Sequence, residues 1–451
     1  MHHPSLILIV AAMGFASPAP AQICEWALET APNPAGTLTL FGLDAADTGE
    51  LWTVGSRIVL TSPGVDRFNY AARWNGSAWI ETPVPQPSTL RNSQNLQDVV
   101  SIGANFAIAV GAHRPAVGAS QSVAVRWDGD EWSLMDAPFV NGGSTFEAIG
   151  RAGADVWTVG GKFSELPPPA ASGYPLAAKL EGGEWTVHFV PPRATVGSQS
   201  KNTLRGIEGA SANDAWAVGF AEQSGADDPF GPAAMAAHWN GSTWTQVDLF
   251  PLLDSTDFSG LEDLAAIATD DVWAVGYDYD LTRQLTIPLI LHWDGSAWTK
   301  AAVPTFDFSA ELRAVAARGP DDVYAAGTQP DANGIPHALM LHYDGSSWSA
   351  IPQKQIGDFE TWFRALTFQG ETLWASGQAN TVSDGFTQRT MSCNPACAAD
   401  LASDGQLDFS DVAAFLTAFA SADPIADFNV DGSFDFSDVS AFLTAFGAGC
   451  P

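Results

Sequence analysis

Basic side chains are scarce in this sequence. Acidic residues outnumber lysines and arginines by 51 to 19, which gives a formal net charge of -32. A chain with this charge repels the phosphates of nucleic acids and anionic membrane surfaces, so the sequence argues against both as partners. Cations and neutral ligands fit its overall charge better.

Long apolar runs are missing as well, except at the N-terminus. There, residues 6–15 are apolar and lead into Ala19-Pro20-Ala21, a pattern typical of a signal peptide that is cleaved after Ala21. No later apolar run reaches the roughly 18 to 20 residues that cross a bilayer. The sequence therefore predicts a signal peptide over residues 1–21 and a secreted or extracellular protein without a membrane span.

Catalytic signatures are also missing. The sequence contains no His-Glu-x-x-His zinc helix, no Gly-x-Ser-x-Gly elbow and no phosphate-binding glycine loop. A pair of carboxylates acting on a polysaccharide would leave no such motif, because its members converge only in the fold. Two hypotheses stay open: a binding or scaffolding protein, and a polysaccharide-active enzyme, either a glycoside hydrolase or a lyase.

Internal repeats organise most of the chain. A Trp-Ala-Val-Gly motif occurs seven times, with variation, at spacings of 49 to 59 residues. Its copies end at Gly55, Gly111, Gly160, Gly219, Gly276, Gly327 and Gly377. This period is typical of one four-stranded propeller blade, whereas a solenoid coil is usually shorter.

Each repeat divides into four predicted strands. In one repeat, residues 312–315 precede the motif strand 323–327, and the preceding repeat ends with strands 288–293 and 296–303. Between the last two strands, Asp294-Gly295 predicts a two-residue type I′ hairpin turn. The same hairpin recurs after Trp74, Trp127, Trp239 and Tyr343, with a degenerate copy after Leu180.

The seventh motif has no such hairpin after it, and the N-terminus supplies a matching strand. Cys24-Glu-Trp26 aligns with Ser296-Ala-Trp298, which begins a fourth strand. A blade completed from both chain ends closes the ring and removes exposed sheet edges. The sequence therefore predicts an all-β fold, a seven-bladed β-propeller over residues 22–394 closed by an N-terminal strand.

These repeats resemble those of bacterial extracellular propellers with Trp-Ala-Val-Gly and His-Trp-Asp-Gly-Ser-x-Trp motifs, a broad group without one shared activity. The recurring tryptophans occupy equivalent places in the repeats, which favours core packing over sugar binding. His238, His292 and His342 also share one repeat position, which favours a stabilising role over a metal-binding or catalytic one.

The C-terminal segment carries a calcium-loop pattern twice. In each copy acidic side chains alternate around a glycine, so that their oxygens can converge on one hard cation that takes six to eight oxygen ligands. The predicted ligands are Asp400, Asp404, Gln406, Asp408 and Asp411 in the first loop, and Asp427, Asn429, Asp431, Ser433, Asp435 and Asp438 in the second. Ala402 stands where the second loop has Asn429, so we expect two calcium sites of which the first is weaker.

An apolar stripe follows each loop. Its members lie at i, i+3, i+4 and i+7, the spacing of one face of a short helix. They are Val412, Phe415, Leu416 and Phe419 after the first loop, and Val439, Phe442, Leu443 and Phe446 after the second. We expect two helices that pack on one another in a small domain over residues 395–451.

The duplicated loop and helix, with Asp at the twelfth loop position, resemble dockerin domains. The flanking Cys397 and the terminal Gly449-Cys450-Pro451 are similar to the bacterial GC-type variety. The resemblance implies a fold ordered by calcium and a cohesin-like or other surface receptor that binds the exposed helix faces. It also implies attachment to a cell surface or secreted assembly, and no catalysis.

The same resemblance gives recognition candidates. Phe409-Ser410 and Phe436-Ser437 occupy loop positions 10 and 11, where dockerins bind their partner. Phenylalanine at position 10 departs from the Ser or Thr common in cellulosomal dockerins, so the identity of the partner stays open.

A ligand of the propeller, carbohydrate or protein, is expected on the face with the connections between second and third strands and between blades. These loops vary in length, whereas the opposite face consists of short turns. The candidates are His113, Arg114, Lys162, Glu165, Asp227, Asp228, Asp278, Tyr279, Asp280 and Arg283.

Four cysteines allow three pairings in an oxidising compartment. The repeat register distinguishes them, because Cys24 aligns with Ser296 and Cys393 aligns with Trp293, the residues that flank the hairpin turn in a complete repeat. Residues at those places face each other across adjacent strands, with Cα atoms about 5.5 Å apart, as a disulfide requires.

We therefore predict disulfides between Cys24 and Cys393 and between Cys397 and Cys450. The first would replace the missing hairpin, at a loop-entropy gain of up to about 4 to 5 kcal/mol, and the second would tie the ends of the calcium-loop module. Non-reducing peptide mapping of the secreted protein checks both, and a link from Cys24 to Cys450 would contradict the repeat register.

Overall fold

The computed structural model describes most of the chain. The described residues are 23–32, 36–61, 64–87, 93–103, 105–115, 118–138, 142–163, 173–193, 200–223, 233–254, 258–351, 353, 360–379, 384–394, 399, 401, 407, 409–421, 423–428 and 433–448. The predicted signal peptide lies outside these residues.

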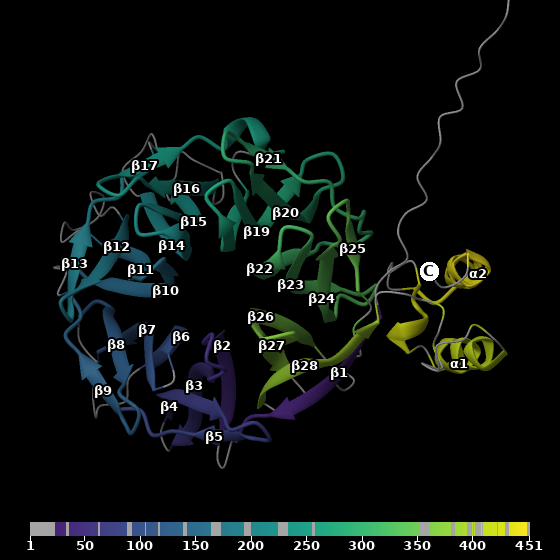
Figure 1. Cartoon of the computed structure of the whole chain (residues 1–451), viewed down its shortest axis with the longest axis horizontal. Helices are drawn as coiled ribbons and strands as arrows, with labels where there is room; N and C mark the ends of the chain where they lie inside the picture. Colours follow the sequence, from purple (N-terminus) through teal and green to yellow (C-terminus); the bar gives the residue numbers. More distant parts are fainter. Residues whose placement is uncertain are drawn as a thin grey trace, which may run out of the picture.

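The described strands are arranged as a β-propeller (Figure 1). They form five four-stranded sheets and one eight-stranded sheet, in which a single parallel bridge between Ala152 and Gly209 joins two four-stranded halves. Four strand positions therefore recur from the central axis outward, as the repeat predicts.

The innermost strands are β2 (Thr37–Ala45), β6 (Ser93–Gly103), β10 (Ser144–Ala152), β14 (Ser200–Ser211), β18 (Gly260–Ala268), β22 (Glu311–Gly319) and β26 (Thr361–Gln369). The second strands are β3 (Leu51–Thr61), β7 (Phe106–Arg114), β11 (Asp155–Phe163), β15 (Asp214–Gln223), β19 (Asp271–Asp280), β23 (Asp322–Pro330) and β27 (Thr372–Ala379). Each second strand contains one copy of the motif.

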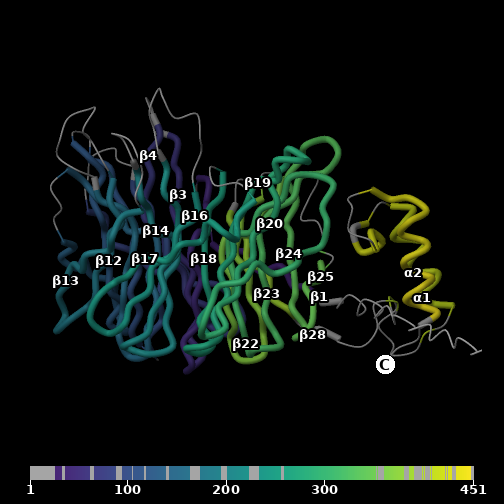
Figure 2. Tube along the Cα trace, turned by 90° about the horizontal axis from the view of Figure 1, so that it is seen from above, coloured from purple at the N-terminus to yellow at the C-terminus, as the bar shows by residue number. Residues whose placement is uncertain are grey.

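The third strands are β4 (Gly64–Trp74), β8 (Gln121–Trp127), β12 (Gly173–Glu181), β16 (Ala233–Trp239), β20 (Leu285–Trp293), β24 (Pro336–Tyr343) and β28 (Asp384–Asn394). The outermost are β5 (Trp79–Glu81), β9 (Trp132–Met135), β13 (Glu184–His188), β17 (Trp244–Val247), β21 (Trp298–Lys300), β25 (Trp348–Ala350) and β1 (Ile23–Thr30). Figure 2 shows the strands running between the two faces of the propeller.

The N-terminal strand joins the last sheet. β1 pairs antiparallel with β28, and in this register the Cα atoms of Cys24 and Cys393 are partners. The backbone therefore has the register on which the disulfide prediction rests. The side chains of these two cysteines, and the whole of Cys397 and Cys450, lie outside the described part, so both disulfides stay predictions.

The outer hairpins differ from the predicted type I′ turn. A type I′ turn needs positive φ at both central residues, but in the hairpin after Trp293 only Gly295 has it, with φ of 86°. Asp294 instead accepts backbone hydrogen bonds from Ser296 and Ala297 at 2.9 and 2.8 Å. The strand pairing resumes at Trp298, so the loop is a four-residue Asx turn.

Each inner strand carries a β-bulge at the same repeat position. The bulge brings a backbone carbonyl of the inner strand against the motif glycine of the second strand. A Cβ atom on Gly327 would lie 2.0 Å from the Glu311 carbonyl oxygen, and one on Gly55 would lie 1.9 Å from the Thr39 carbonyl oxygen. The last motif residue is therefore glycine because the bulge leaves no room for a side chain.

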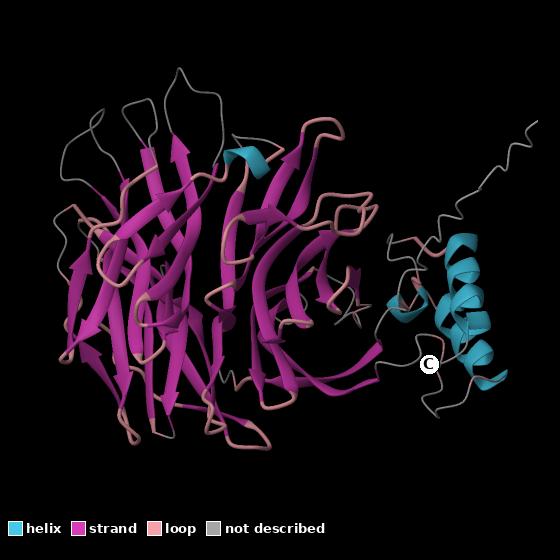
Figure 3. Ribbon diagram, turned by 45° about the horizontal axis from the view of Figure 1, so that its top comes forward, coloured by secondary structure: helices cyan, strands magenta, loops and turns pink. Residues whose placement is uncertain are grey.

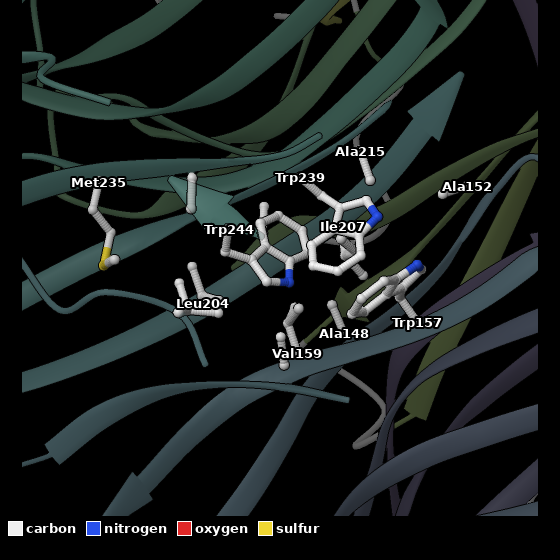
Figure 4. Packing of buried hydrophobic residues seen from close by; sticks show 14 of the residues in the cluster. Ala148, Ala152, Trp157, Val159, Leu204, Ile207, Ala215, Met235, Trp239 and Trp244 are labelled. Atoms are coloured by element: carbon white, nitrogen blue, oxygen red, sulfur yellow. The ribbon is translucent and has the colours of Figure 1, made fainter. Parts of the chain in front are cut away.

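The motif tryptophans pack between neighbouring sheets, as predicted. Figure 4 shows Trp157 of β11 beside Trp239 and Trp244, which belong to the other four-stranded half of the eight-stranded sheet. Their ring centroids lie 5.0 and 5.4 Å from that of Trp157, in T-shaped contacts. Trp157 is fully buried, and burying an aromatic side chain contributes about 1.5 to 3 kcal/mol.

Two helices follow the propeller, α1 (Phe409–Ala420) and α2 (Phe436–Ala448) (Figure 3). They pack on one another as predicted, with Phe415 and Phe442 stacked at 4.2 Å between ring centroids. The predicted stripe is wrong at its i+4 positions, because Leu416 and Leu443 are 55% and 54% exposed. Two short helices that share one narrow contact bury only part of a four-residue stripe.

Two 3₁₀ turns complete the described elements, η1 (Phe250–Leu252) and η2 (Pro424–Ala426). Across the ranges given above, no helix has the length and apolar character needed to cross a membrane.

The close contact at the motif glycine predicts that a methyl group added there lowers the stability of the fold, whereas one added at a glycine in open space does not. Gly327→Ala should lower the free energy of unfolding by at least about 2 to 3 kcal/mol, because its Cβ would overlap the Glu311 carbonyl. Gly319→Ala in the same hairpin is the control, since open space surrounds that position. Denaturant melts of both variants decide the point, and equal losses would refute the steric explanation.

Candidate functional site

One residue of each inner strand has no partner in the strand register, because it lies at the bulge. These residues are Phe41, Gln97, Glu147, Arg205, Glu262, Arg313 and Arg364, which we name the channel ring. A bulge can redirect a side chain out of the alternation of a strand. All members of the channel ring line one cavity.

The cavity lies in the central channel and has a volume of about 570 Å³. Its wall consists of residues of the inner strands from the channel ring onward, and it reaches Asp47 and Arg318 near the short turns. The long loops expected to carry the ligand leave the opposite end of these strands. None of the seven loop candidates that belong to the described residues lines the cavity.

Charges in the channel ring pair with one another. Glu147 accepts a hydrogen bond from Gln97 at 3.2 Å and forms an ion pair with Arg205 at 3.0 Å. Arg205 also lies 3.9 Å from Glu262. Burial acts to lower the pKa of Arg205, but the two carboxylates outweigh burial and raise it. Both glutamates are therefore engaged by residues of neighbouring strands.

A second group of acidic residues lines the cavity beyond the ring. Each accepts a backbone N–H bond from the inner strand of the following sheet. The pairs are Asp44 with Ser101 at 2.6 Å, Asp98 with Ile149 at 2.9 Å, Glu208 with Ala266 at 2.9 Å, and Asp263 with Val315 at 2.9 Å. These carboxyl groups thus tie adjacent sheets together.

Burial raises the pKa of these groups. It raises the pKa of Asp44 and Asp263 to about 7 and that of Glu208 to about 8, although backbone hydrogen bonds act in the opposite direction. Burial also raises the pKa of Asp98 well above its ordinary value, and the charges of Asp263 and Asp44 add to this rise. Part of this acidic group is therefore protonated near neutral pH.

The described loop candidates have local structural roles. Asp278 is buried and contacts Lys300 Nζ at 2.9 Å, and Asp280 accepts backbone hydrogen bonds from Thr282 and Arg283 in its own turn. Tyr279 packs on Phe258 with ring centroids 5.6 Å apart. These contacts hold the β19–β20 hairpin and its neighbouring loop.

The remaining loop candidates are spread over other sheets. His113 and Arg114 end β7, Lys162 lies near the end of β11, and burial lowers the pKa of His113. Glu165, Asp227 and Asp228 lie outside the described residues. The structure therefore brings Asp278, Tyr279, Asp280 and Arg283 together in one hairpin, and it records no contact between that hairpin and β7 or β11.

The three repeated histidines stabilise their sheets, as predicted. His292 Nε2 contacts Asp271 at 2.8 Å, and its ring stacks on Trp273 at 4.2 Å. His238 contacts Asp214 at 2.6 Å and His342 contacts Asp322 at 2.8 Å in the same arrangement. A site built identically in three sheets serves the repeat rather than one ligand.

The C-terminal module shows part of the predicted calcium loops. Asp411 and Asp438, at the twelfth loop positions, are fully buried in the first turns of α1 and α2, and Asp427 is 9% exposed. Ser433 and Asp435 are exposed, and a hydrogen bond from Ser437 lowers the pKa of Asp435. The other predicted ligands, Asp400, Asp404, Gln406, Asp408, Asn429 and Asp431, lie outside the described residues.

The predicted recognition residues lie on the surface of this module. Phe409 and Phe436 are 80% and 81% exposed, and Ser410 and Ser437 beside them are exposed too.

Within the described ranges, no three His, Cys, Asp or Glu side chains gather closely enough to hold a metal ion.

The channel ring itself was missed from the sequence. In the sequence, each member of the channel ring directly follows a Leu or Phe that recurs in every inner strand. The residues at this place are Phe, Gln, Glu, Arg, Glu, Arg and Arg along the repeats. A polar residue at this place looks like the exposed side of an alternating strand. Only the bulge shows that it points into the channel.

The raised pKa of Glu208 predicts a pH-dependent stability. The pKa of Glu208 rises from 4.5 to about 8 on folding, so protonated Glu208 contributes to the stability of the fold. This contribution is fully present below pH 4.5 and is lost as the pH rises through about 8. Glu208→Gln loses this dependence, so its Tm relative to the natural protein should rise between about pH 5 and pH 8.5.

Asp280→Asn is the matched control in thermal melts. Backbone hydrogen bonds from Arg283 and Thr282 lower the pKa of Asp280, so its Tm difference should stay constant across the same range. A constant difference for Glu208→Gln as well would show that the buried carboxyl is ionised throughout.

No protein-family model and no curated protein matches this chain. Similar solved structures include YCF48 bound to D1 peptide, which is 13% identical, with 83% of this chain and 98% of that chain covered and a TM-score of 0.48. A catalytically inactive virginiamycin B lyase from Staphylococcus aureus with quinupristin is 13% identical, with 82% and 100% covered and a TM-score of 0.45. The WD40 β-propeller domain of Doa1 is 10% identical, with 81% and 97% covered and a TM-score of 0.44.

Proposed function

We propose that this chain is a secreted binding or scaffolding protein. In this proposal a seven-bladed propeller, closed by β1, binds its ligand in the central channel. A calcium-dependent, dockerin-like module over residues 395–451 attaches it to a cohesin-like or other surface receptor. The propeller ligand is a carbohydrate or a protein segment small enough to enter the channel.

The channel ring carries the proposal. The bulge of every inner strand directs one side chain into the same cavity. These side chains are three arginines, two glutamates, one glutamine and one phenylalanine, whereas the motif glycine of the scaffold is the same in every repeat. A purely structural position would repeat with the scaffold, as the motif glycine does. Variable side chains at a repeated, inward position are typical of a binding site.

The pairing of β1 with β28 supports closure of the ring. β1 completes the sheet that begins with β26, so this sheet also has four strands and takes them from both chain ends. β2 and β26 contact one another, which places the first and last inner strands side by side. A closed ring leaves only short, protected sheet edges.

Two buried carboxylates support the calcium-dependent module. Asp411 and Asp438 occupy the same place in the two halves, and both are fully buried at the start of a helix, where the calcium-loop pattern expects its twelfth ligand. Oxygen donors are what calcium requires. The exposed Phe409 and Phe436 offer an apolar surface that suits a protein partner rather than a solvated face.

A polysaccharide-active enzyme is the second candidate, and one observation favours it. Asp44, Asp263 and Glu208 have pKa values raised to between about 7 and 8 and line the cavity, as a general acid would. Against this, each already accepts a backbone hydrogen bond that joins two sheets. Binding therefore accounts for more of the channel than catalysis does.

A polysaccharide and peptide array with the full-length protein tests the function. Gln97→Trp puts a large ring into the cavity and should abolish the signal, whereas Thr245→Trp on the exposed outer strand β17 should leave it unchanged. A signal that survives Gln97→Trp would place binding on the loop face instead. Release of soluble sugar from a bound polysaccharide would establish the enzyme.

Calorimetry of the same protein tests the attachment module. Calcium should bind at one tighter and one weaker site, since Ala402 removes one ligand from the first loop. A chelator should melt this module but leave array binding by the propeller unchanged. Two equal sites would contradict the argument from Ala402, and the absence of binding would remove the dockerin-like assignment.

A further inference from the structure

Arg364 differs from the other charged members of the channel ring. Its guanidinium lies over the ring of Phe41, 5.1 Å from the centroid, and 5.9 Å from the centroid of Trp362. No carboxylate of the described residues forms an ion pair with it, although Arg205 pairs with Glu147 and Arg313 pairs with Glu311. Phe41, its neighbour on the next inner strand, offers no acceptor.

The guanidinium of Arg364 is also incompletely hydrogen-bonded. Its Nε atom is buried and has no hydrogen-bond partner. Burial, together with the positive charge of Arg313, lowers the pKa of Arg364 to about 10, so the side chain is still charged at neutral pH. A buried donor on a charged group costs free energy until an acceptor meets it.

We propose that Arg364 binds the carboxylate of an acidic sugar in the central channel. This inference rests on the binding function proposed above and specifies its ligand. The planar guanidinium fork matches the two oxygens of a carboxylate, and the ring of Phe41 leaves an apolar side against which the pair can lie.

The surrounding charges favour a singly charged, planar anion. The negative charges of Glu311 on β22 and Glu262 on β18 act on Arg364, and they would repel the second charge of a phosphate ester. The rest of the cavity wall includes Gln97 and Asp44, whose side-chain oxygens can accept further hydrogen bonds from hydroxyl groups. A ligand that carries hydroxyl groups beside a carboxylate would fit these acceptors and Arg364, and a uronic acid is such a ligand.

Calorimetric titration of the full-length protein with D-glucuronate tests this assignment, with N-methyl-D-glucuronamide as the neutral analogue. The carboxylate should bind at least about tenfold more tightly than the amide. Arg364→Gln should lose that preference, and Arg364→Lys, which keeps the charge without the fork, should keep part of it. Arg126→Gln removes an exposed arginine of the third strand β8, outside the cavity wall, and should bind as the natural protein does.

Thermal melts separate recognition from a structural role. Arg364 has no ion pair, so Arg364→Gln should lose only the contacts with Phe41 and Trp362 and should still unfold cooperatively close to the Tm of the natural protein. Equal affinity for glucuronate and its amide, or an unchanged preference in Arg364→Gln, would overturn the inference.

Two further outcomes are informative. Binding of acetylglycine in place of glucuronate would also overturn the sugar assignment and would identify a peptide C-terminus as the ligand. If neutral glycans bind the channel and Gln97→Trp blocks them while Arg364→Gln does not, the proposed function stands and this inference fails.

Discussion

The contact between the motif glycine and a backbone carbonyl of the inner strand determines most of this structure. The carbonyl approaches so closely that a Cβ atom would lie 1.9 to 2.2 Å away in all of the motif copies. That approach is part of the bulge, and the bulge turns the next residue out of the strand register into the channel. One steric constraint, repeated along the chain, therefore builds both the scaffold and the wall of the candidate site.

This arrangement separates the fold from the chemistry of the site. The glycine, the apolar position and the motif tryptophan are tied to the packing between sheets, so they repeat, while the bulged residues line the channel, contact one another there and vary in type. The charge of the site can then differ strongly from the charge of the rest of the protein. Three arginines belong to the channel ring of a chain whose net charge is -32, because net charge describes long-range attraction rather than the field inside one cavity.

The repeat period predicted the strands, their order outward from the axis and the pairing of β1 with β28, because apolar alternation and hairpin spacing are local signals. The predicted turn type was wrong, since the side chain of Asp294 takes the backbone N–H groups of the loop before a two-residue turn can form. The channel ring was missed because period-two reasoning fails at a bulge. Arg364 looks solvent-facing in sequence, and only contacts between strands place it against Phe41.

The break in charge pairing falls where the two ends of the chain meet. Arg364 lies on β26 and Phe41 on β2, the last and first inner strands. In the described part of the chain, no carboxyl group on one of these two strands accepts a hydrogen bond from a backbone N–H of the other. Other contacts join the sheets here, among them a 2.7 Å hydrogen bond from Trp79 Nε1 to Thr387 Oγ1 and the packing of Trp374 on Trp74. These contacts lie away from the channel. They therefore hold the first and last sheets together without neutralising the charge of Arg364. An arginine can then stay charged and without an ion pair at a junction that other contacts hold together.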